Sequence, residues 1–184
     1  MKLNIGSGEA RRDGYINIDR QARHAPDLVW DLERTPWPFD DNVVEEVVAH
    51  HVLTHLGRRP PVFYGIIREL YRVLQPGGTI DIITVHPRCD DYWSDPTNVR
   101  PITPQGMARF GRAYAAVFAE AGVPASALAE ELDVDFEIVS IENQLLGDWA
   151  HRFSAGELTA EQVDRAAQES WNVVQHINMV MRKL

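Results

Sequence analysis

Two stretches decide the fold: Lys2-Leu3-Asn4-Ile5-Gly6-Ser7-Gly8 and, after six intervening residues, Tyr15-Ile16-Asn17-Ile18-Asp19. Each begins as a short apolar strand. The first runs into a Gly-x-Gly turn and the second ends in a carboxylate. In a parallel α/β sheet, this pattern places the turn and the acid at the carboxyl ends of neighbouring strands, where such sheets bind nucleotide-like ligands. Glycine lets the backbone approach a ligand closely, and a carboxylate such as Asp19 can accept hydrogen bonds from ribose hydroxyls.

The interval between the turn and the acid distinguishes among nucleotides. A dinucleotide site requires Gly-x-Gly-x-x-Gly at the start of a full helix, with its acid about 20 residues further on. Here Asp19 follows Gly8 by 11 positions, and Arg11 occupies the place of the third glycine. Residues 9–14 are too few for a three-turn helix, so the helix N-terminus that would bind a pyrophosphate is short or missing. The spacing favours a ligand with a ribose but no phosphate, although an ordinary strand-turn-strand would use glycines in the same way.

Length and composition indicate one globular domain over residues 1–184. A formal net charge of −9 argues against a general nucleic-acid binder, which usually has a basic surface. The single cysteine, Cys89, excludes an intrachain disulfide and a cysteine-rich zinc site. The chain starts in strand-like sequence without a signal-peptide pattern, and no apolar run approaches the 18 residues of a spanning helix. We therefore expect a cytoplasmic protein without a membrane partner.

The order of the expected elements is typical of a parallel sheet. Residues 61–74 carry apolar side chains at helical spacing, Gln75-Pro76-Gly77-Gly78 ends that helix, and a strand over 79–85 follows at once. Further short strands are expected at 3–5, 15–18, 28–30 and 47–48, where apolar runs are unalternating as in strands buried on both faces.

The last third of the chain has a different pattern. Thr103 and Pro104 predict the start of a helix that runs to about residue 121 and stops at Gly122. Two strands are expected over 136–142 and 172–183. Between them, a capping box that begins at Thr159 predicts a helix to about residue 169.

Two segments place polar groups at expected strand ends. Asp31 ends the segment 27–32, where its carboxylate could accept from an exocyclic amine while the Leu32 amide donates to a ring nitrogen, as an adenine edge requires. An Asp that caps a turn is the other reading. His51 and His55 share the spacing of a helical metal site, but Val52 occupies the place of the glutamate that metalloprotease chemistry needs, so the sequence predicts no metal site.

The segment 86–103 follows the expected strand 79–85 and is rich in His, Asp, Tyr, Trp and Arg. Loops after the strands of an open parallel sheet face the ligand crevice. We expect this segment and residues 143–171 to form substrate-side loops, a solvated connection being the alternative. Cys89 is not expected to act as a nucleophile, because the neighbouring Asp90 and Asp91 disfavour its thiolate.

Taken together, these motifs resemble the class I S-adenosylmethionine-dependent methyltransferases, and most closely the short members of the methyltransferase type 11 group. The resemblance is carried, in this order, by residues 3–8, 14–19, 27–32, 38–42, 49–56, 70–78 and 95–100. It implies an α/β, Rossmann-like sheet of seven mostly parallel strands with a C-terminal antiparallel hairpin and helices on both faces. It also implies S-adenosylmethionine as the cofactor, bound by Asn4, Gly6, Gly8, Asp19, Arg20, Asp31, Leu32, His50 and His51. Three positions depart from the family pattern: Asn4, Ala10 and Thr54 replace a frequent acid, a third glycine and a glutamate.

The chemistry of a sulfonium methyl sets the catalytic expectation. The methyl group is already activated, so the enzyme need only align a nucleophile for in-line attack and exclude water. A base is useful when the acceptor carries a proton, and histidine suits that role near neutral pH. His50 is the leading candidate, followed by His86 and Asp95.

We expect methyl transfer to a small-molecule or sugar-type acceptor, because no tract suggests recognition of a protein or nucleic acid. A catalytically inactive methyltransferase fold that binds cofactor or a partner is the first alternative. Another nucleotide-dependent α/β enzyme, such as a dehydrogenase, is the second, and the short interval between Gly8 and Asp19 argues against it.

Overall fold

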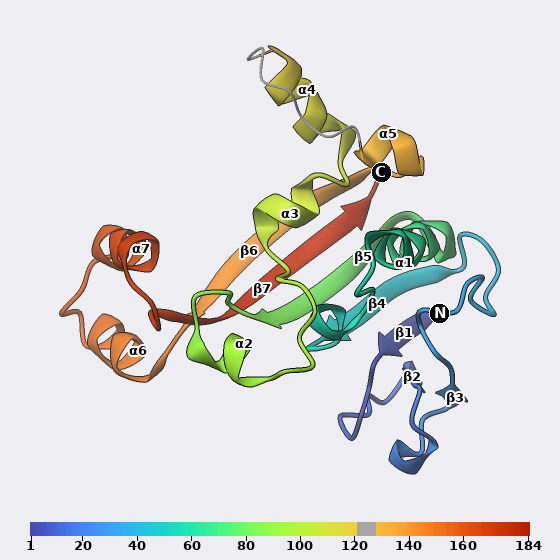
Figure 1. Cartoon of the computed structure of the whole chain (residues 1–184), viewed down its shortest axis with the longest axis horizontal. Coiled ribbons are helices and arrows are strands. Elements are labelled where there is room, and N and C mark those ends of the chain that lie inside the picture. Colours follow the sequence, from blue (N-terminus) through green and yellow to red (C-terminus); the bar gives the residue numbers. More distant parts are fainter. Residues whose placement is uncertain (121–127) are drawn as a thin grey trace.

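The computed structural model describes residues 1–120 and 128–184 (Figure 1). Its strands form one seven-stranded sheet in the order β3-β2-β1-β4-β5-β7-β6. They are β1 (Lys2–Ile5), β2 (Ile16–Asp19), β3 (Leu28–Val29), β4 (Val44–His50), β5 (Leu74–Val85), β6 (Phe136–Leu145) and β7 (Val174–Lys183). β1 to β5 are parallel, and β7 is antiparallel to both β5 and β6. The Rossmann-like methyltransferase sheet with a C-terminal antiparallel hairpin is therefore confirmed.

The described helices are short apart from α1. They are η1 (Ala22–His24), η2 (Leu53–His55), α1 (Pro60–Val73), α2 (Asp90–Ser94), α3 (Pro104–Ala108), α4 (Arg112–Glu120), α5 (Leu128–Leu132), α6 (Gly147–Ser154) and α7 (Ala160–Glu169). None of the helices in residues 1–120 and 128–184 is long and apolar enough to cross a bilayer.

The connection from β1 to β2 is a loop of turns, as its length predicts. The buried side chain of Asn17 organises it: its Oδ1 accepts from Asn4 Nδ2 at 2.9 Å and from the Arg12 amide at 2.8 Å. Its Nδ2 donates to Asp27 at 2.7 Å, which ties the loop to the start of β3. These bonds on the Asp27 carboxylate, from Asn17 and Arg11, lower its pKa to about 2. Side-chain amides thus supply the rigidity that a crossover helix would otherwise provide.

The apolar core lies between α1 and the sheet. The buried face of α1, which includes Phe63, Ile66 and Leu70, packs in one cluster with strand residues such as Val47 and Ile80. Pro60 stands at the first position of the helix, where its missing amide costs nothing. The predicted helix over 61–74 is confirmed within one residue at each end, and the strand that follows it is β5.

The helix predicted from Pro104 to residue 121 is broken in the structure. Thr103 caps α3 as expected, with its side chain accepting from the Gly106 amide, but α3 ends at Ala108 and α4 begins at Arg112. At Gly111, an added Cβ would lie 2.2 Å from the carbonyl oxygen of Phe136. The Phe110 carbonyl accepts from the Phe136 amide at 3.0 Å and the Arg112 amide donates to Asp135 Oδ1 at 2.8 Å, so neither group is used in a continuous helix. The predicted stop at Gly122 lies outside the described residues.

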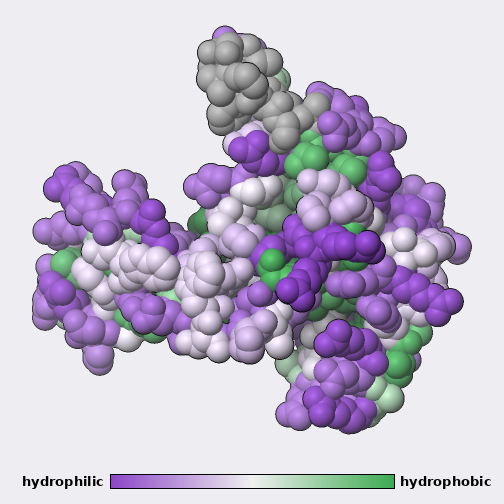
Figure 2. Space-filling model, viewed as in Figure 1, coloured by the Kyte–Doolittle hydropathy of each residue, from purple (hydrophilic) through white to green (hydrophobic). Residues whose placement is uncertain are grey.

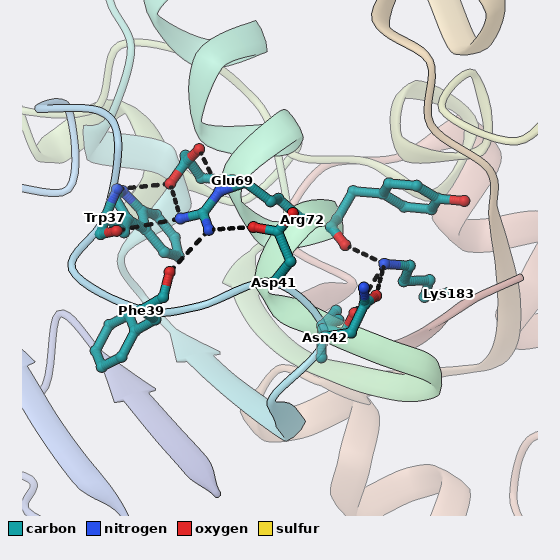
Figure 3. A network of polar contacts seen from close by, with 9 residues as sticks. Trp37, Phe39, Asp41, Asn42, Glu69, Arg72 and Lys183 are labelled. Carbon is teal, nitrogen blue, oxygen red and sulfur yellow. Dashed lines mark hydrogen bonds and ion pairs between the residues drawn. The ribbon is translucent and has the colours of Figure 1, made fainter.

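A polar network fastens the loop before β4 to α1, at the sheet edge opposite to the glycine turn (Figure 3). Arg72 donates to Glu69 at 2.7 Å, to Asp41 at 2.7 Å and to the carbonyl oxygens of Trp37 and Phe39. Burial alone would raise the pKa of Glu69, but the bonds from Arg72 and from the Trp37 amide hold it below its usual value.

Lys183 lies beside this network and is also buried, but its charge is satisfied by neutral oxygen atoms (Figure 3). Its side-chain ammonium donates to Asn42 Oδ1 at 2.7 Å and to the carbonyl oxygens of Tyr71 and Leu74 at 2.6 and 2.8 Å. Burial lowers the pKa of Lys183. The last residues of β7 are thereby joined to the end of α1 and to the loop before β4.

Helices α6 and α7 form a lobe, residues 146–172, between β6 and β7; it stands out at the left end of the molecule (Figures 1 and 2). The capping box at Thr159 is confirmed: its Oγ1 accepts from the Gln162 amide at 3.2 Å, and Gln162 Oε1 accepts from the Thr159 amide at 2.8 Å. Arg88, in the loop after β5, donates to the carbonyl oxygens of Ala167 and Gln168 at the carboxyl end of α7. The lobe is thus attached to the sheet by side-chain bonds as well as by its two strands.

Candidate cofactor site

A cavity of about 420 Å³ opens at the carboxyl ends of β1, β2 and β4. Its lining comprises Gly6, Asp19, Arg20, Gln21, Trp30, Asp31, Leu32, His51, Val52, His55, Leu56, Asp95 and Thr97. Its volume is within the range of small-molecule sites. The fold thus brings together most of the residues expected to bind the cofactor, together with one of the expected catalytic residues, Asp95.

Asp19 is the most constrained acid of this cavity, at 9% exposure. Its Oδ2 accepts from the Gly8 amide at 2.9 Å and its Oδ1 from the Gln21 amide at 2.8 Å. An ionised carboxylate has about four acceptor positions, so two remain for a ligand. Its position next to the glycine turn is the arrangement expected of a group that binds a ribose diol.

Gly6 forms the floor of the cavity. It adopts φ +61°, and an added Cβ would lie 2.2 Å from Val52 Cγ2, so only glycine fits. Ser7, the next residue, is buried, and its hydroxyl has no hydrogen-bond partner among residues 1–120 and 128–184. A buried polar atom without a partner is rare in folded proteins. Ser7 follows Gly6, which lines the cavity, but its own buried hydroxyl is not part of the lining.

Asp31, Leu32 and Trp30 form the far wall of the cavity. Asp31 Oδ1 accepts from the Glu33 amide at 3.0 Å, which turns the chain sharply after β3. The Leu32 side chain is buried, whereas the Asp31 carboxylate is exposed to the cavity side of this turn. One carboxylate, one backbone segment and an indole ring together suit a flat base that carries an exocyclic amine.

His51 has an unusual conformation, with φ +53° directly after the last residue of β4. This turn directs its ring away from the strand, where it lines the cavity and contacts His176 of β7. Burial lowers the pKa of His51, and the neighbouring His176, His50 and His55 lower it further. The imidazole is therefore neutral at neutral pH and available to accept a proton.

Asp95, Thr97 and His55 form a chain of hydrogen bonds on the third side of the cavity. The Thr97 hydroxyl donates to Asp95 Oδ1 at 2.6 Å, so it accepts from His55 Nδ1 at 3.0 Å. The bonds from Thr97 lower the pKa of Asp95. Asp95 is therefore held as an anion, which favours a cationic ligand and makes this carboxylate a weak base.

The other expected site residues lie outside the lining. His50 Nδ1 is 3.1 Å from Arg12 Nη2 and its Nε2 is 3.1 Å from Asp81 Oδ2, so both ring nitrogens have partners in the protein. His86 lines a separate cavity of about 390 Å³ with Arg88 and Asn143.

Asn4 and Gly8 support the cavity from behind. Asn4 Nδ2 donates to the Ala10 carbonyl at 2.9 Å, and the Gly8 amide orients Asp19 at 2.9 Å. Both therefore shape the glycine turn.

Several lining residues were missed at the level of sequence. The cavity is also lined by residues that were not among those expected to bind the cofactor: Gln21, Trp30, Val52, His55, Leu56 and Thr97. The hydrogen bonds from His55 through Thr97 to Asp95 join residues up to 40 positions apart in the sequence. They depend on the loop after β5, which returns to η2, where the Val99 amide donates to the Thr54 carbonyl at 2.8 Å. Only the clustering of polar residues in 86–103 pointed in this direction.

Comparison with known proteins agrees with this geometry. A family model described as a methyltransferase domain, Methyltransf_11, matches residues 13–82. No protein matches in a comparison with curated proteins.

Solved structures match along the whole chain. One is a SAM-dependent methyltransferase from Archaeoglobus fulgidus, with a TM-score of 0.62 and 15% identity over 99% of this chain and 85% of that one. Another, from Methanosarcina mazei, has a TM-score of 0.56 and 17% identity over 100% and 92%. The [4+2]-cyclase SpnF also matches, with a TM-score of 0.53 and 20% identity over 99% and 74%. At these identities the structural likeness shows the fold alone, since one fold can carry several activities. The family match and the fold together assign residues 13–82 to the methyltransferase type 11 group, on the class I fold of the S-adenosylmethionine-dependent methyltransferases.

Proposed function

We propose that the protein binds S-adenosylmethionine in the 420 Å³ cavity and transfers its methyl group to a small-molecule acceptor. The observation that carries this proposal is the convergence of Gly6, Asp19 and Asp31 on one cavity at the carboxyl edge of the sheet. Asp19 accepts the ribose hydroxyls at its two remaining acceptor positions. Asp31 and the Leu32 amide hold the adenine edge, and Trp30 packs beside the base.

The methionyl half of the cofactor extends towards Gly6 and His51. Gly6 brings its backbone to this half, and the Asp95 anion, which also lines the cavity, favours its positive charge. These groups discriminate in favour of the cationic sulfonium over its neutral product. A cavity of this size without a charged group would not favour the sulfonium over the neutral product, because an unpaired charge is costly to bury.

The transfer itself needs little from the protein. When bound, S-adenosylmethionine supplies a methyl group that moves to the acceptor as the carbon–sulfur bond breaks and its electron pair returns to sulfur. His51 accepts the proton that the acceptor loses, because its pKa is lowered and its ring lines the cavity. His50, the base favoured on sequence alone, is held instead between Arg12 and Asp81.

Isothermal calorimetry with S-adenosylmethionine and S-adenosylhomocysteine tests the cofactor site. We expect micromolar binding of both to the wild type and a loss of at least thirtyfold in Asp19→Ala. Because Asp19 also holds two backbone amides, Asp31→Ala provides a second variant at an exposed position, with an expected loss of about tenfold. Asp13→Ala is the matched control: Asp13 is exposed, lies in the same part of the chain and does not line the cavity.

The outcomes separate the alternatives. No binding to either ligand by the folded wild type overturns the proposal. Binding that Asp19→Ala and Asp31→Ala leave unchanged places the cofactor elsewhere and also contradicts it. Binding without methyl transfer to any member of a broad acceptor panel favours the other hypothesis, a methyltransferase fold that binds cofactor without turnover.

A further inference from the structure

A second cavity of about 540 Å³ lies between the lobe and the ends of β6 and β7. Its lining is mainly apolar. Leu145 and Val174 come from the strands, Phe153 from α6, and Val163 and Ala167 from α7. Val163 is 7% exposed and forms the floor, whereas Phe153 is 44% exposed at the rim. An open cavity with this lining is suited to an apolar group about as large as a small ligand.

This cavity lies at the same edge of the sheet as the cofactor cavity. β6 is antiparallel to β7 and β7 is antiparallel to β5, so β6 runs in the same direction as β4 and β5. The carboxyl ends of these three strands therefore meet at one edge, and Figure 1 shows the lobe beyond the end of β6.

Three side chains in a row, those of His51, His176 and Gln144, connect the two cavities. His51 lines the cofactor cavity, and its ring lies 5.0 Å from the ring of His176. His176 Nδ1 lies 3.1 Å from Gln144 Oε1, and Gln144 lines the apolar cavity. The wall between the cavities is therefore polar and contains the histidine that the proposed function uses as the proton acceptor.

The lobe is held in place relative to this wall. Asn172, at the start of its return to β7, exchanges hydrogen bonds with Asp90 at 2.8 Å, and Gln175 donates to Asp91 at 3.1 Å. Arg88 binds the carboxyl end of α7. A cavity whose lobe is held by three anchors from residues 88–91 is preorganised, which reduces the entropic cost of binding.

We propose that this cavity binds the apolar body of the methyl acceptor while the acceptor's nucleophilic atom points past Gln144 and His176 towards His51. The inference rests on the proposed function and narrows it. The acceptor carries an alkyl or aryl group that fills the space between α6 and α7, so a free sugar does not satisfy the site. Asn143 and Gln144 provide the polar contacts for the end that reacts.

The test uses probes that do not require the acceptor to be known. They are aza analogues of S-adenosylhomocysteine in which nitrogen replaces sulfur and carries a butyl, octyl or dodecyl chain. The alkyl chain is bonded to the nitrogen that replaces the sulfur, in the place of the transferred methyl group. It therefore extends in the direction in which the acceptor must lie. Affinity is measured by calorimetry and should increase about fourfold for each methylene that enters the cavity. A chain of ethylene glycol units of equal length should bring no comparable gain.

Two variants locate the chain. Ala150→Trp fills the cavity from an exposed position of α6 that lines it, and it should remove most of the gain of the dodecyl probe. Ala155→Trp is the matched control, because Ala155 is exposed at the end of the same helix and does not line the cavity. Affinity for S-adenosylhomocysteine itself should be equal in all three proteins.

Failure of this inference is distinguishable from failure of the proposed function. Loss of S-adenosylhomocysteine binding in the wild type would contradict the proposed function. If S-adenosylhomocysteine binds but the dodecyl chain adds nothing, or its gain survives Ala150→Trp, the cavity is not the acceptor site. A dimer in sedimentation velocity that Ala150→Trp dissociates would instead assign the cavity to a second copy of the chain and overturn the inference.

Discussion

The rings of His51 and His176 meet edge to face, with centroids 5.0 Å apart and planes at 75°. His51 follows β4 and His176 belongs to β7, so the contact joins the parallel part of the sheet to the C-terminal hairpin. Burial lowers the pKa of His51, and the neighbouring His176 lowers it further. The cofactor cavity therefore has a pH-sensitive group whose charge state depends on the element that leads to the lobe.

The first prediction concerns the pH dependence of cofactor binding. Because the pKa of His51 is lowered from its usual value of 6.5, its charge appears only as the pH falls below that value. A charged His51 repels the sulfonium of S-adenosylmethionine but not the neutral sulfur of S-adenosylhomocysteine. The affinity for S-adenosylmethionine relative to that for S-adenosylhomocysteine should therefore fall at least threefold between pH 8 and pH 5. The His51→Gln substitution should remove most of this change. His151→Gln, at an exposed position of the lobe, should keep it; a pH-independent ratio in the wild type would contradict this role.

The same group affects stability. The folded-state pKa of His51 lies below its unfolded value, so the stability that its neutral ring contributes is present above pH 6.5 and is lost as the pH falls through the folded pKa. His51→Gln should make the free energy of unfolding fall less steeply with decreasing pH, as measured by urea unfolding between pH 7 and pH 5. His86, whose pKa burial also lowers, should give a separate and additive effect in His86→Gln. An unchanged slope in His51→Gln would show that the surroundings of this ring do not favour its neutral form.

The second prediction compares the two glycines of the turn. Both have positive φ, +61° at Gly6 and +49° at Gly8, but only at Gly6 would a Cβ meet Val52. Gly8→Ala should cost about 1 kcal/mol of stability from backbone strain alone. Gly6→Ala should cost more, and Val52→Ala in the Gly6→Ala background should recover the difference. Equal losses in the two single variants, measured by urea unfolding, would show that Val52 yields without cost.

The third prediction concerns the network of Figure 3. Arg72→Met removes the partner of Glu69, whose side chain is 10% exposed, and leaves its carboxylate buried without a cation. We expect a loss of about 3 kcal/mol in the free energy of unfolding, at the lower limit for a broken buried pair because Arg72 is 26% exposed. Arg165→Met is the control, since its pair with Glu161 is highly exposed and should change stability by less than about 0.5 kcal/mol. Similar losses in the two variants would mean that Arg72 acts as an ordinary surface charge.

The fourth prediction concerns Cys89, the single cysteine. Its side chain is 1% exposed, and burial raises the pKa of its thiol. We expect its reaction with a disulfide reagent at pH 8 to be at least a hundredfold slower in the native protein than in urea. The Cys89→Ser variant, which cannot react, sets the background. Rapid reaction of the native protein would show that the loop after β5 opens readily.

The sequence predicted the parts of the fold that depend on local chemistry. The interval from Gly8 to Asp19 predicted the missing crossover helix, and the capping box at Thr159 predicted the start of α7. Both depend on bonds between residues close together in the chain. The same locality explains why Gly6, Asp19 and Asp31, which the sequence predicts to act together, line one cavity.

What the sequence did not show depends on tertiary contacts. The strand β4 begins at Val44, but Glu46 interrupts its apolar pattern in the sequence. The Glu46 carboxylate accepts hydrogen bonds from Lys2 and Tyr15, both at 2.8 Å, and these residues lie in other segments of the chain. Helix α6 has no side-chain cap, and the break between α3 and α4 accompanies hydrogen bonds to Asp135 and Phe136, which lie more than 20 positions further on. His51 and His50 look equivalent in the sequence, and only the left-handed turn at His51 directs one ring to the cavity and leaves the other with Arg12.

The loop between β1 and β2 has a consequence for how cofactor preference could change. In a full Rossmann unit, exchanging one acid or arginine can alter which nucleotide is preferred, because the crossover helix is already present to receive a pyrophosphate. Here residues 9–14 form turns, and Asn17 secures them with bonds to both neighbouring segments. A change to a dinucleotide would require an insertion of about ten residues to build that helix, together with the loss of the asparagine bonds. We therefore expect that no single substitution changes the nucleotide preference, because that preference depends on the length of the connection between β1 and β2.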